Sequence, residues 1–240
     1  MKQHQVPWQP YQLRFSLIGL EDGVAKPDLS DLFGVEVEDT TYAGPQKDLR
    51  QSAMLGAGQL TLSATQARID FVWQSLPPTG EFFRLGDLQE AVPHLLNPIR
   101  ALIGGHSWGR VAFGAVCGAR VADRIEGYGQ LNERLAEVEV NGENSADFLY
   151  QVNKPVQVQC GTRSILLNRL HKWNVARIKF LGMFPDIESV DALPAFADIL
   201  VSQVTIDFNT SSESVARLSG EESLAVIEYA IQDAAELIGG

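Results

Sequence analysis

Hydrophobic and polar residues alternate along several segments of this chain, with the period of two that is typical of a half-buried β-strand. The alternation is clearest over residues 200–208, where Val204, Ile206 and Phe208 share one face. Residues 59–64 and 67–74 alternate on either side of a short polar turn, which predicts a β-hairpin. Further strands are predicted at residues 12–20, 110–121, 149–153, 156–160, 165–173 and 175–181.

Apolar residues spaced three and four apart predict an amphipathic helix over residues 85–103. Pro93 and Pro98 lie inside this segment, and they predict a kink or a break into two pieces. A short helix is predicted over residues 28–33. Residues 35–57 show no clear period, so no element is predicted there.

A second amphipathic helix is predicted at the end of the chain. Ser219 and Glu222 have the spacing of a capping box, which marks a helix start. The apolar face expected for this helix consists of Leu224, Ile227, Ile231 and Ala235.

These elements predict an α+β protein with a largely antiparallel sheet. Residues 1–125 give the order β-α-β-β-α-β, which is typical of a ferredoxin-like unit. Residues 126–240 form a strand-rich half that the terminal helix closes. We expect the two halves to share a core, and a single domain is the alternative.

Composition excludes several classes of protein. The 240 residues are 45% hydrophobic, which supports a substantial core. No apolar run approaches membrane-spanning length and the first twenty residues do not resemble a signal peptide, so a cytoplasmic protein without membrane association is expected. Cys117 and Cys160 lie in apolar runs without metal-ligand spacing, which predicts reduced core thiols and no metal or cofactor.

Charge is distributed unevenly along the chain. The net charge of −11 opposes non-specific binding of nucleic acid, because such binding depends on neutralising phosphates. Residues 148–185, however, contain no Asp or Glu. This acid-free stretch could bind an anion, a nucleotide, a single nucleic-acid strand or an acidic partner. The alternative is an ordinary solvated sheet face balanced by acids elsewhere in the chain. Its candidate binding residues are Arg163, Arg169, Lys172, Arg177 and Lys179.

Residues 105–109 spell Gly-His-Ser-Trp-Gly, a G-x-S-x-G motif. Over residues 99–119 the chain resembles the nucleophile elbow of the α/β-hydrolase family. The resemblance implies that Ser107 is the nucleophile, and His171 is the only histidine after it that could serve as base. The alternative is a plain helix-to-strand turn in which Trp108 packs, since the preceding segments predict a hairpin rather than a parallel sheet.

Two segments, residues 108–135 and 200–238, together resemble a sporadically distributed bacterial family of unknown function. The first contains Arg110 and the run Asp123-Arg124-Ile125, and the second contains Ile206-Asp207-Phe208 before the closing helix. The family implies no activity. Its patchy distribution implies a role associated with defence or mobile elements.

The leading hypothesis is a non-enzymatic binding or assembly protein that acts in a complex, with a protein partner or with copies of itself. One alternative is a serine hydrolase that uses Ser107 and His171. The other is a nucleotide or anion binder that uses the acid-free stretch.

Overall fold

The computed structural model describes residues 8–21, 24–44, 48–76, 85–135, 137–179, 198–212 and 216–239. Within them lie ten strands and four helices. The strands of the first half are β1 (Gln9–Ile18), β2 (Val37–Ala43), β3 (Asp48–Leu55), β4 (Gly58–Ala64), β5 (Arg68–Ser75) and β6 (Arg110–Val121). The later strands are β7 (Leu149–Asn153), β8 (Val156–Cys160), β9 (Arg163–Lys179) and β10 (Asp198–Thr210). The helices are α1 (Leu29–Phe33), α2 (Leu88–Gly104), α3 (Arg124–Arg134) and α4 (Gly220–Gly239).

All ten strands join one sheet, in the order β2-β3-β4-β5-β1-β6-β10-β9-β7, with β8 paired to the first part of β9. Every described pairing is antiparallel, which confirms the predicted α+β class and the largely antiparallel sheet. The sheet continues from one half of the chain into the other, because β6 pairs with β10. The predicted boundary between residues 125 and 126 falls inside α3.

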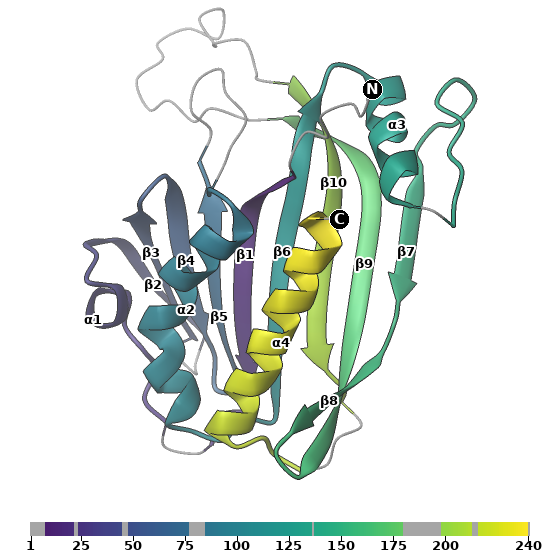
Figure 1. The fold of residues 1–240 in the computed structure, drawn as a ribbon. Helices are drawn as coiled ribbons and strands as arrows, with labels where there is room; N and C mark the ends of the chain where they lie inside the picture. The colour runs from purple at the N-terminus through teal and green to yellow at the C-terminus, as the bar shows by residue number, and fades with distance from the viewer. Residues whose placement is uncertain are drawn as a thin grey trace, which may run out of the picture.

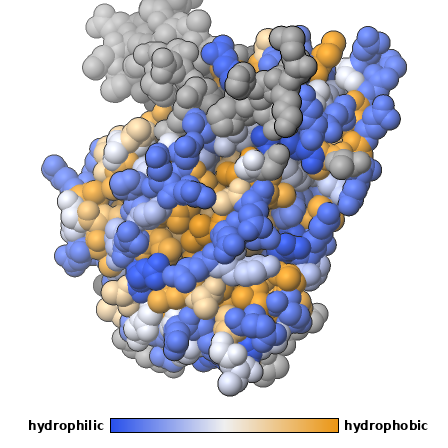
Figure 2. Space-filling model, in the orientation of Figure 1, coloured by the Kyte–Doolittle hydropathy of each residue, from blue (hydrophilic) through white to orange (hydrophobic). Residues whose placement is uncertain are grey.

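The helices cover one face of this sheet (Figure 1). Strand residues of one parity, among them Phe15, Phe71, Phe113 and Phe208, point to that face and are fully buried in a single core cluster with α2, α3 and α4. Seen from this side, hydrophobic residues gather near the middle of the molecule with hydrophilic ones around them (Figure 2). The opposite face of the sheet carries mostly polar side chains, and we call it the open face.

Several predicted elements agree with the structure, namely the strands at residues 110–121, 149–153 and 156–160 and the hairpin of β4 and β5. The helix predicted at residues 85–103 is α2, which runs through both prolines without a break. Pro93 is exposed, and the buried residues lie on the other side of the helix, so the prolines interrupt no contact with the core.

The capping box at the start of α4 is also present. The Ser219 hydroxyl accepts from the Glu222 N–H at 3.2 Å, and the Glu222 carboxylate accepts from the Ser219 N–H at 2.8 Å. Of the four residues expected on the apolar face of α4, Ile227 is buried, and the other three are partly buried and pack against the core: Leu224, Ile231 and Ala235. Val226 and Ile238 are buried as well. Small residues complete the contact, because they let the helix backbone approach the sheet: Gly220, Ser223, Ala230 and Ala234 are all buried.

The ferredoxin-like order predicted for residues 1–125 is not confirmed. Residues 37–55 form a further hairpin, β2 and β3, where no element was predicted. Four strands therefore separate α1 from α2, instead of the two that the predicted order requires. Helix α3 was also missed. No described helix is long and apolar enough to cross a membrane.

Candidate functional site

Ser107 lies on the turn between α2 and β6, so the chain runs from helix to strand, the reverse of a nucleophile elbow. Its hydroxyl donates to the Glu21 carboxylate and accepts from Nε of Arg217 at 3.3 Å. Arg217 also donates to the backbone oxygens of Gly19 and Ser107. Trp108 is fully buried, and its indole N–H donates to the Ile103 carbonyl at 2.9 Å. These contacts close the turn against the end of β1.

His171 lies in the middle of β9, far from this turn. In the sheet register it is opposite Ile206, which in turn is opposite Ala115 of β6. Ala115 is five residues beyond Arg110, where β6 begins, so the row of His171 crosses β6 roughly 17 Å along the strand from its start. The described structure therefore does not bring His171 to Ser107.

Two arginines of the acid-free stretch pair with acids of α4. One Arg163 nitrogen contacts both carboxylate oxygens of Glu222, at 2.9 and 2.7 Å. Arg169 contacts Asp233 at 2.7 Å. Both guanidinium groups are thus engaged within the chain, and they tie β9 to the helix above it.

The other candidates of this stretch do not gather beside them. Lys172 is exposed and lies on the open face, because it has the opposite parity to Arg169. Arg177 is exposed near the far end of β9. Arg177 and Arg120 line an open hollow of about 530 Å³. Ile199, which also lines it, comes directly after residues 180–197 and Asp198, and residues 180–197 lie outside the described part of the chain. The side chain of Lys179 lies outside the described residues.

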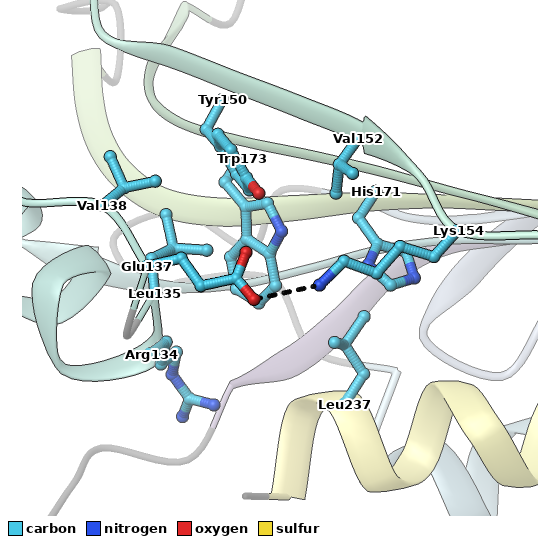
Figure 3. A pocket seen from close by; sticks show the side chains of 10 residues that line it. All are labelled: Arg134, Leu135, Glu137, Val138, Tyr150, Val152, Lys154, His171, Trp173 and Leu237. Carbon is cyan, nitrogen blue, oxygen red and sulfur yellow. Dashed lines mark ion pairs between the residues drawn. The ribbon is translucent and has the colours of Figure 1, made fainter.

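A smaller cavity, of about 210 Å³, lies around His171 on the helix-bearing face. We call it the His171 pocket (Figure 3). Residues from α3 and the segment after it, from β7, from β9 and from the end of α4 form its walls. They are Arg134, Leu135, Glu137, Val138, Tyr150, Val152, Lys154, His171, Trp173 and Leu237.

His171 is the buried polar group of this pocket, with 7% of its surface exposed. Its ring packs against Phe208 at 5.3 Å between centroids, and its Nε2 has no hydrogen-bond partner among the described residues. Burial lowers the pKa of His171 to about 4, helped by the positive charge of Arg169. The imidazole is therefore neutral near pH 7, and its Nε2 can donate or accept one hydrogen bond to a ligand, depending on the tautomer.

Two cations and one acid lie around the pocket. The Lys154 ammonium is 3.7 Å from the Glu137 carboxylate, and its chain lies across His171 (Figure 3). Arg134 packs its guanidinium over the Trp8 ring at 4.7 Å and donates to the Ile238 carbonyl at 3.0 Å. Burial lowers the pKa of Arg134, yet an arginine stays protonated in proteins.

Aromatic rings form the wall between these charges. Trp173 is 3% exposed and packs against Trp8 at 5.5 Å between centroids. Tyr150 lies opposite Trp173 in the pairing of β7 with β9. The pocket thus combines a rigid apolar wall with a few polar groups, an arrangement typical of small-molecule sites.

None of the five candidate binding residues of the acid-free stretch lines this pocket, and His171 was predicted only as the base of a hydrolase. The acid-free stretch contains Lys154, His171 and Trp173, and their charge and aromatic character were visible signals. Arg134 and Glu137 were missed because α3 was not predicted, and no local pattern connects them to β9.

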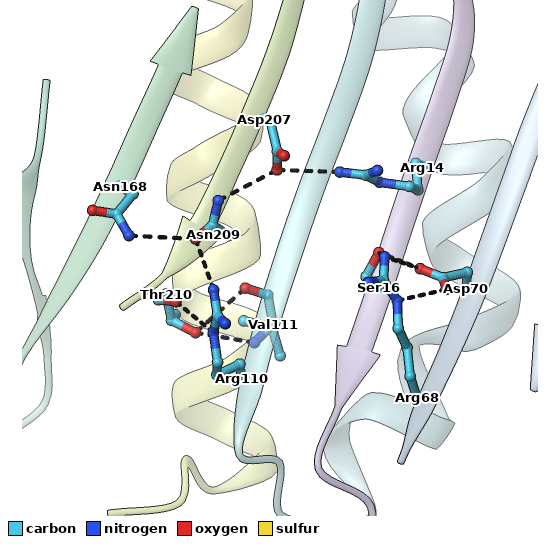
Figure 4. Close-up of polar contacts among 10 residues, drawn as sticks. All are labelled: Arg14, Ser16, Arg68, Asp70, Arg110, Val111, Asn168, Asp207, Asn209 and Thr210. Carbon is cyan, nitrogen blue, oxygen red and sulfur yellow. Dashed lines mark hydrogen bonds and ion pairs between the residues drawn. The ribbon is translucent and has the colours of Figure 1, made fainter. Parts of the chain in front are cut away.

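A second polar arrangement lies on the open face (Figure 4). The Arg68 guanidinium contacts both carboxylate oxygens of Asp70, at 2.6 and 2.8 Å, and Asp70 also accepts from the buried Ser16 hydroxyl at 2.5 Å. Nearer β9, the side-chain oxygen of Asn209 accepts from Arg110 at 2.9 Å and from Asn168 at 3.3 Å. Two polar groups thus lie on the middle of the sheet, one that joins β5 to β1 and one that joins β6 and β9 to β10.

No protein-family model and no curated protein matches this chain. A function is therefore proposed from the geometry of the His171 pocket and of the open face.

Proposed function

We propose that this protein is a non-enzymatic binding protein whose ligand site is the His171 pocket. One observation carries the proposal: a single cavity brings together an aromatic wall, a buried neutral imidazole with an unpartnered nitrogen, and two cations. Unpartnered buried polar atoms are rare in folded proteins, so each one suggests a missing partner. A bound ligand would supply that partner to His171.

Binding fits this pocket better than catalysis does. Among the residues that the structure describes, its lining contains no Ser, Thr or Cys, so no serine, threonine or cysteine nucleophile faces the ligand there. A general acid or base works best when its pKa is near the working pH, and the pKa of His171 is lowered to about 4. The imidazole is therefore suited to recognise a ligand rather than to transfer a proton at neutral pH.

The test is a binding screen on the full chain. We expect members of a fragment library to raise the melting temperature and to show saturation transfer from the protein. The variant Val152→Trp places a large ring in the pocket wall and should abolish these signals. Gln151→Trp is the matched control, because the neighbouring residue of β7 points to the opposite face. Binding that survives Val152→Trp, or a library without any binder, would contradict the proposal.

We further propose that the protein works in a complex, with an acidic protein partner on the open face. Among the described open-face residues, the cations Arg14, Arg50, Arg68, Arg110, Arg120 and Lys172 outnumber the acids Asp39, Asp48, Asp70 and Asp207. The net charge of −11 repels a polyanion such as nucleic acid at long range, which argues against nucleic acid as the occupant of this face. The defence- or mobile-element-associated setting that the family resemblance implies stays a prediction.

Native mass spectrometry of the protein purified from its own cell tests the complex. The variant Lys172→Glu reverses an exposed charge of the open face and should weaken the assembly. Arg100→Glu is the control, because Arg100 lies on α2, on the helix-bearing face. A protein that is monomeric in its own cell, or an assembly equally weakened by both variants, would contradict this part of the proposal.

A further inference from the structure

We infer that the ligand of the His171 pocket is a small monocarboxylate with a flat apolar body, and that its carboxylate replaces Glu137 beside Lys154. The inference rests on the proposed binding function and specifies the chemical class of the ligand.

Lys154 is held in place by its backbone, so its side chain is not needed to anchor this segment. Its N–H donates to the Arg169 carbonyl at 3.0 Å, and its own carbonyl accepts from Nε of Arg169 at 2.8 Å. Arg169 is in turn fixed to Asp233 of α4. Arg169 therefore positions Lys154, and the ammonium group of Lys154 reaches across the pocket (Figure 3).

Glu137 is a weak partner for this ammonium group. The two groups are 3.7 Å apart, whereas Arg169 and Asp233 are 2.7 Å apart. The Glu137 side chain is 73% exposed and that of Lys154 is 48% exposed, and ion pairs in water contribute little. A ligand carboxylate that enters the pocket can therefore displace Glu137 into solvent at small cost.

The balance of charge indicates a single negative charge on the ligand. Arg134 and Lys154 are positive, Glu137 is negative, and Arg169 is balanced by Asp233. The buried imidazole of His171 is neutral, so it adds no further positive charge. Once the ligand has displaced Glu137, the cations Arg134 and Lys154 remain. The Arg134 guanidinium is already engaged by the Trp8 ring and the Ile238 carbonyl, so Lys154 supplies the one positive charge that pairs with the ligand. A phosphate monoester carries nearly two negative charges at neutral pH, so a carboxylate matches the pocket better.

Volume and wall chemistry indicate the rest of the molecule. A dry cavity of about 150 Å³ in another protein holds a benzene molecule. The His171 pocket, at about 210 Å³, has room for one ring and a carboxylate but not for a nucleotide. Trp173 and Tyr150 offer flat surfaces on which such a ring can pack, and Leu237 closes the side toward α4.

Isothermal titration calorimetry of the full chain with benzoate, benzamide and inorganic phosphate tests the inference. Benzoate and benzamide have nearly the same shape, but only benzoate is charged. We expect benzoate to bind at least about tenfold more tightly than benzamide, because a charge-assisted contact is stronger than a neutral one. Phosphate should bind more weakly than benzoate.

Two variants locate the carboxylate. Lys154→Met keeps most of the side-chain length and should weaken benzoate binding about tenfold. Glu137→Gln removes the competing carboxylate and should strengthen it severalfold. Arg100→Met, which removes an exposed cation of α2 that does not line the pocket, is the control and should leave the affinity unchanged.

The possible failures are distinguishable. If benzamide binds as tightly as benzoate, or if Lys154→Met leaves benzoate binding unchanged, the carboxylate inference is overturned. The same holds if other library members bind while benzoate does not. In each of these cases the proposed function still stands, provided that Val152→Trp abolishes the binding that is seen.

Discussion

Arg14 of β1 and Asp207 of β10 form an ion pair of 3.1 Å across the intervening strand β6 (Figure 4). The sheet register places Gly114 of β6 directly between them. A Cβ atom on residue 114 would lie 3.2 Å from Nε of Arg14, so the glycine leaves room for the guanidinium to lie flat on the sheet. The two charged residues and the glycine act as one unit in the open face.

Gly114 and Gly118 both lie on the open-face side of β6, and they should respond differently to the same substitution. In Gly114→Ala the new methyl group meets the flexible end of Arg14, which can shift, so we expect a loss within about 1 kcal/mol. In Gly118→Ala it would lie 2.5 Å from the Ser202 carbonyl, which is backbone of the paired strand, so we expect a loss of about 3 kcal/mol.

Urea denaturation of the two alanine variants measures both losses. Each variant serves as the control for the other, because strand and substitution are the same. Equal losses of unfolding free energy would show that the Arg14 side chain cannot move aside for a methyl group on residue 114.

Ser107 should not react with a fluorophosphonate probe. Its hydroxyl is bound by Glu21 and Arg217, and the row of His171 lies roughly 17 Å along the sheet. Ser107→Ala should lower the free energy of unfolding by about 1 kcal/mol, since it removes hydrogen bonds from a partly exposed turn. Mass spectrometry of the probe-treated chain is the measurement. Labelling that Ser107→Ala removes would restore the hydrolase alternative.

His171 should make stability depend on pH in the weakly acidic range. Its pKa is lowered from 6.5 to about 4, mainly by burial. The positive charges of Arg169 and Lys154 also lower this pKa, and the negative charge of Asp233 raises it in part. Between these pH values the unfolded chain binds a proton that the folded chain does not, so the free energy of unfolding falls as pH falls from 6.5 to 4. We expect a loss of about 2 kcal/mol, because water in the pocket screens part of the charge.

Denaturation series at several pH values, compared with those of His171→Leu, measure this loss. The variant should flatten the dependence between pH 6.5 and 4, since no imidazole remains to be protonated at that position. His94→Gln is the control, because His94 is exposed on α2. An unchanged slope in His171→Leu would mean that other groups cause the pH dependence.

What the sequence determined about this protein is local. Alternation identified the hairpin of β4 and β5 and the strand β10, because buried apolar residues alternate with less buried ones along each of them. The capping box identified the start of α4, since both of its hydrogen bonds join residues three apart. Where these signals were absent, elements were missed. All but the first residue of β2 are exposed, so this strand has no buried face to produce an alternation. The segment of α3 is mainly polar and buries only Gly127, Tyr128 and Leu131.

The candidate site was decided by the tertiary structure. Arg134 and Glu137 lie at and just after the end of α3. Lys154 follows β7, and His171 and Trp173 belong to β9. Local periodicity contains no information about which strands become neighbours or in which register they pair. Register alone sends Lys172 to the open face and His171 to the pocket, because adjacent strand residues point to opposite sides of a sheet. The sequence by itself therefore determined the charged and aromatic stretch, and strand pairing determined which of its residues meet.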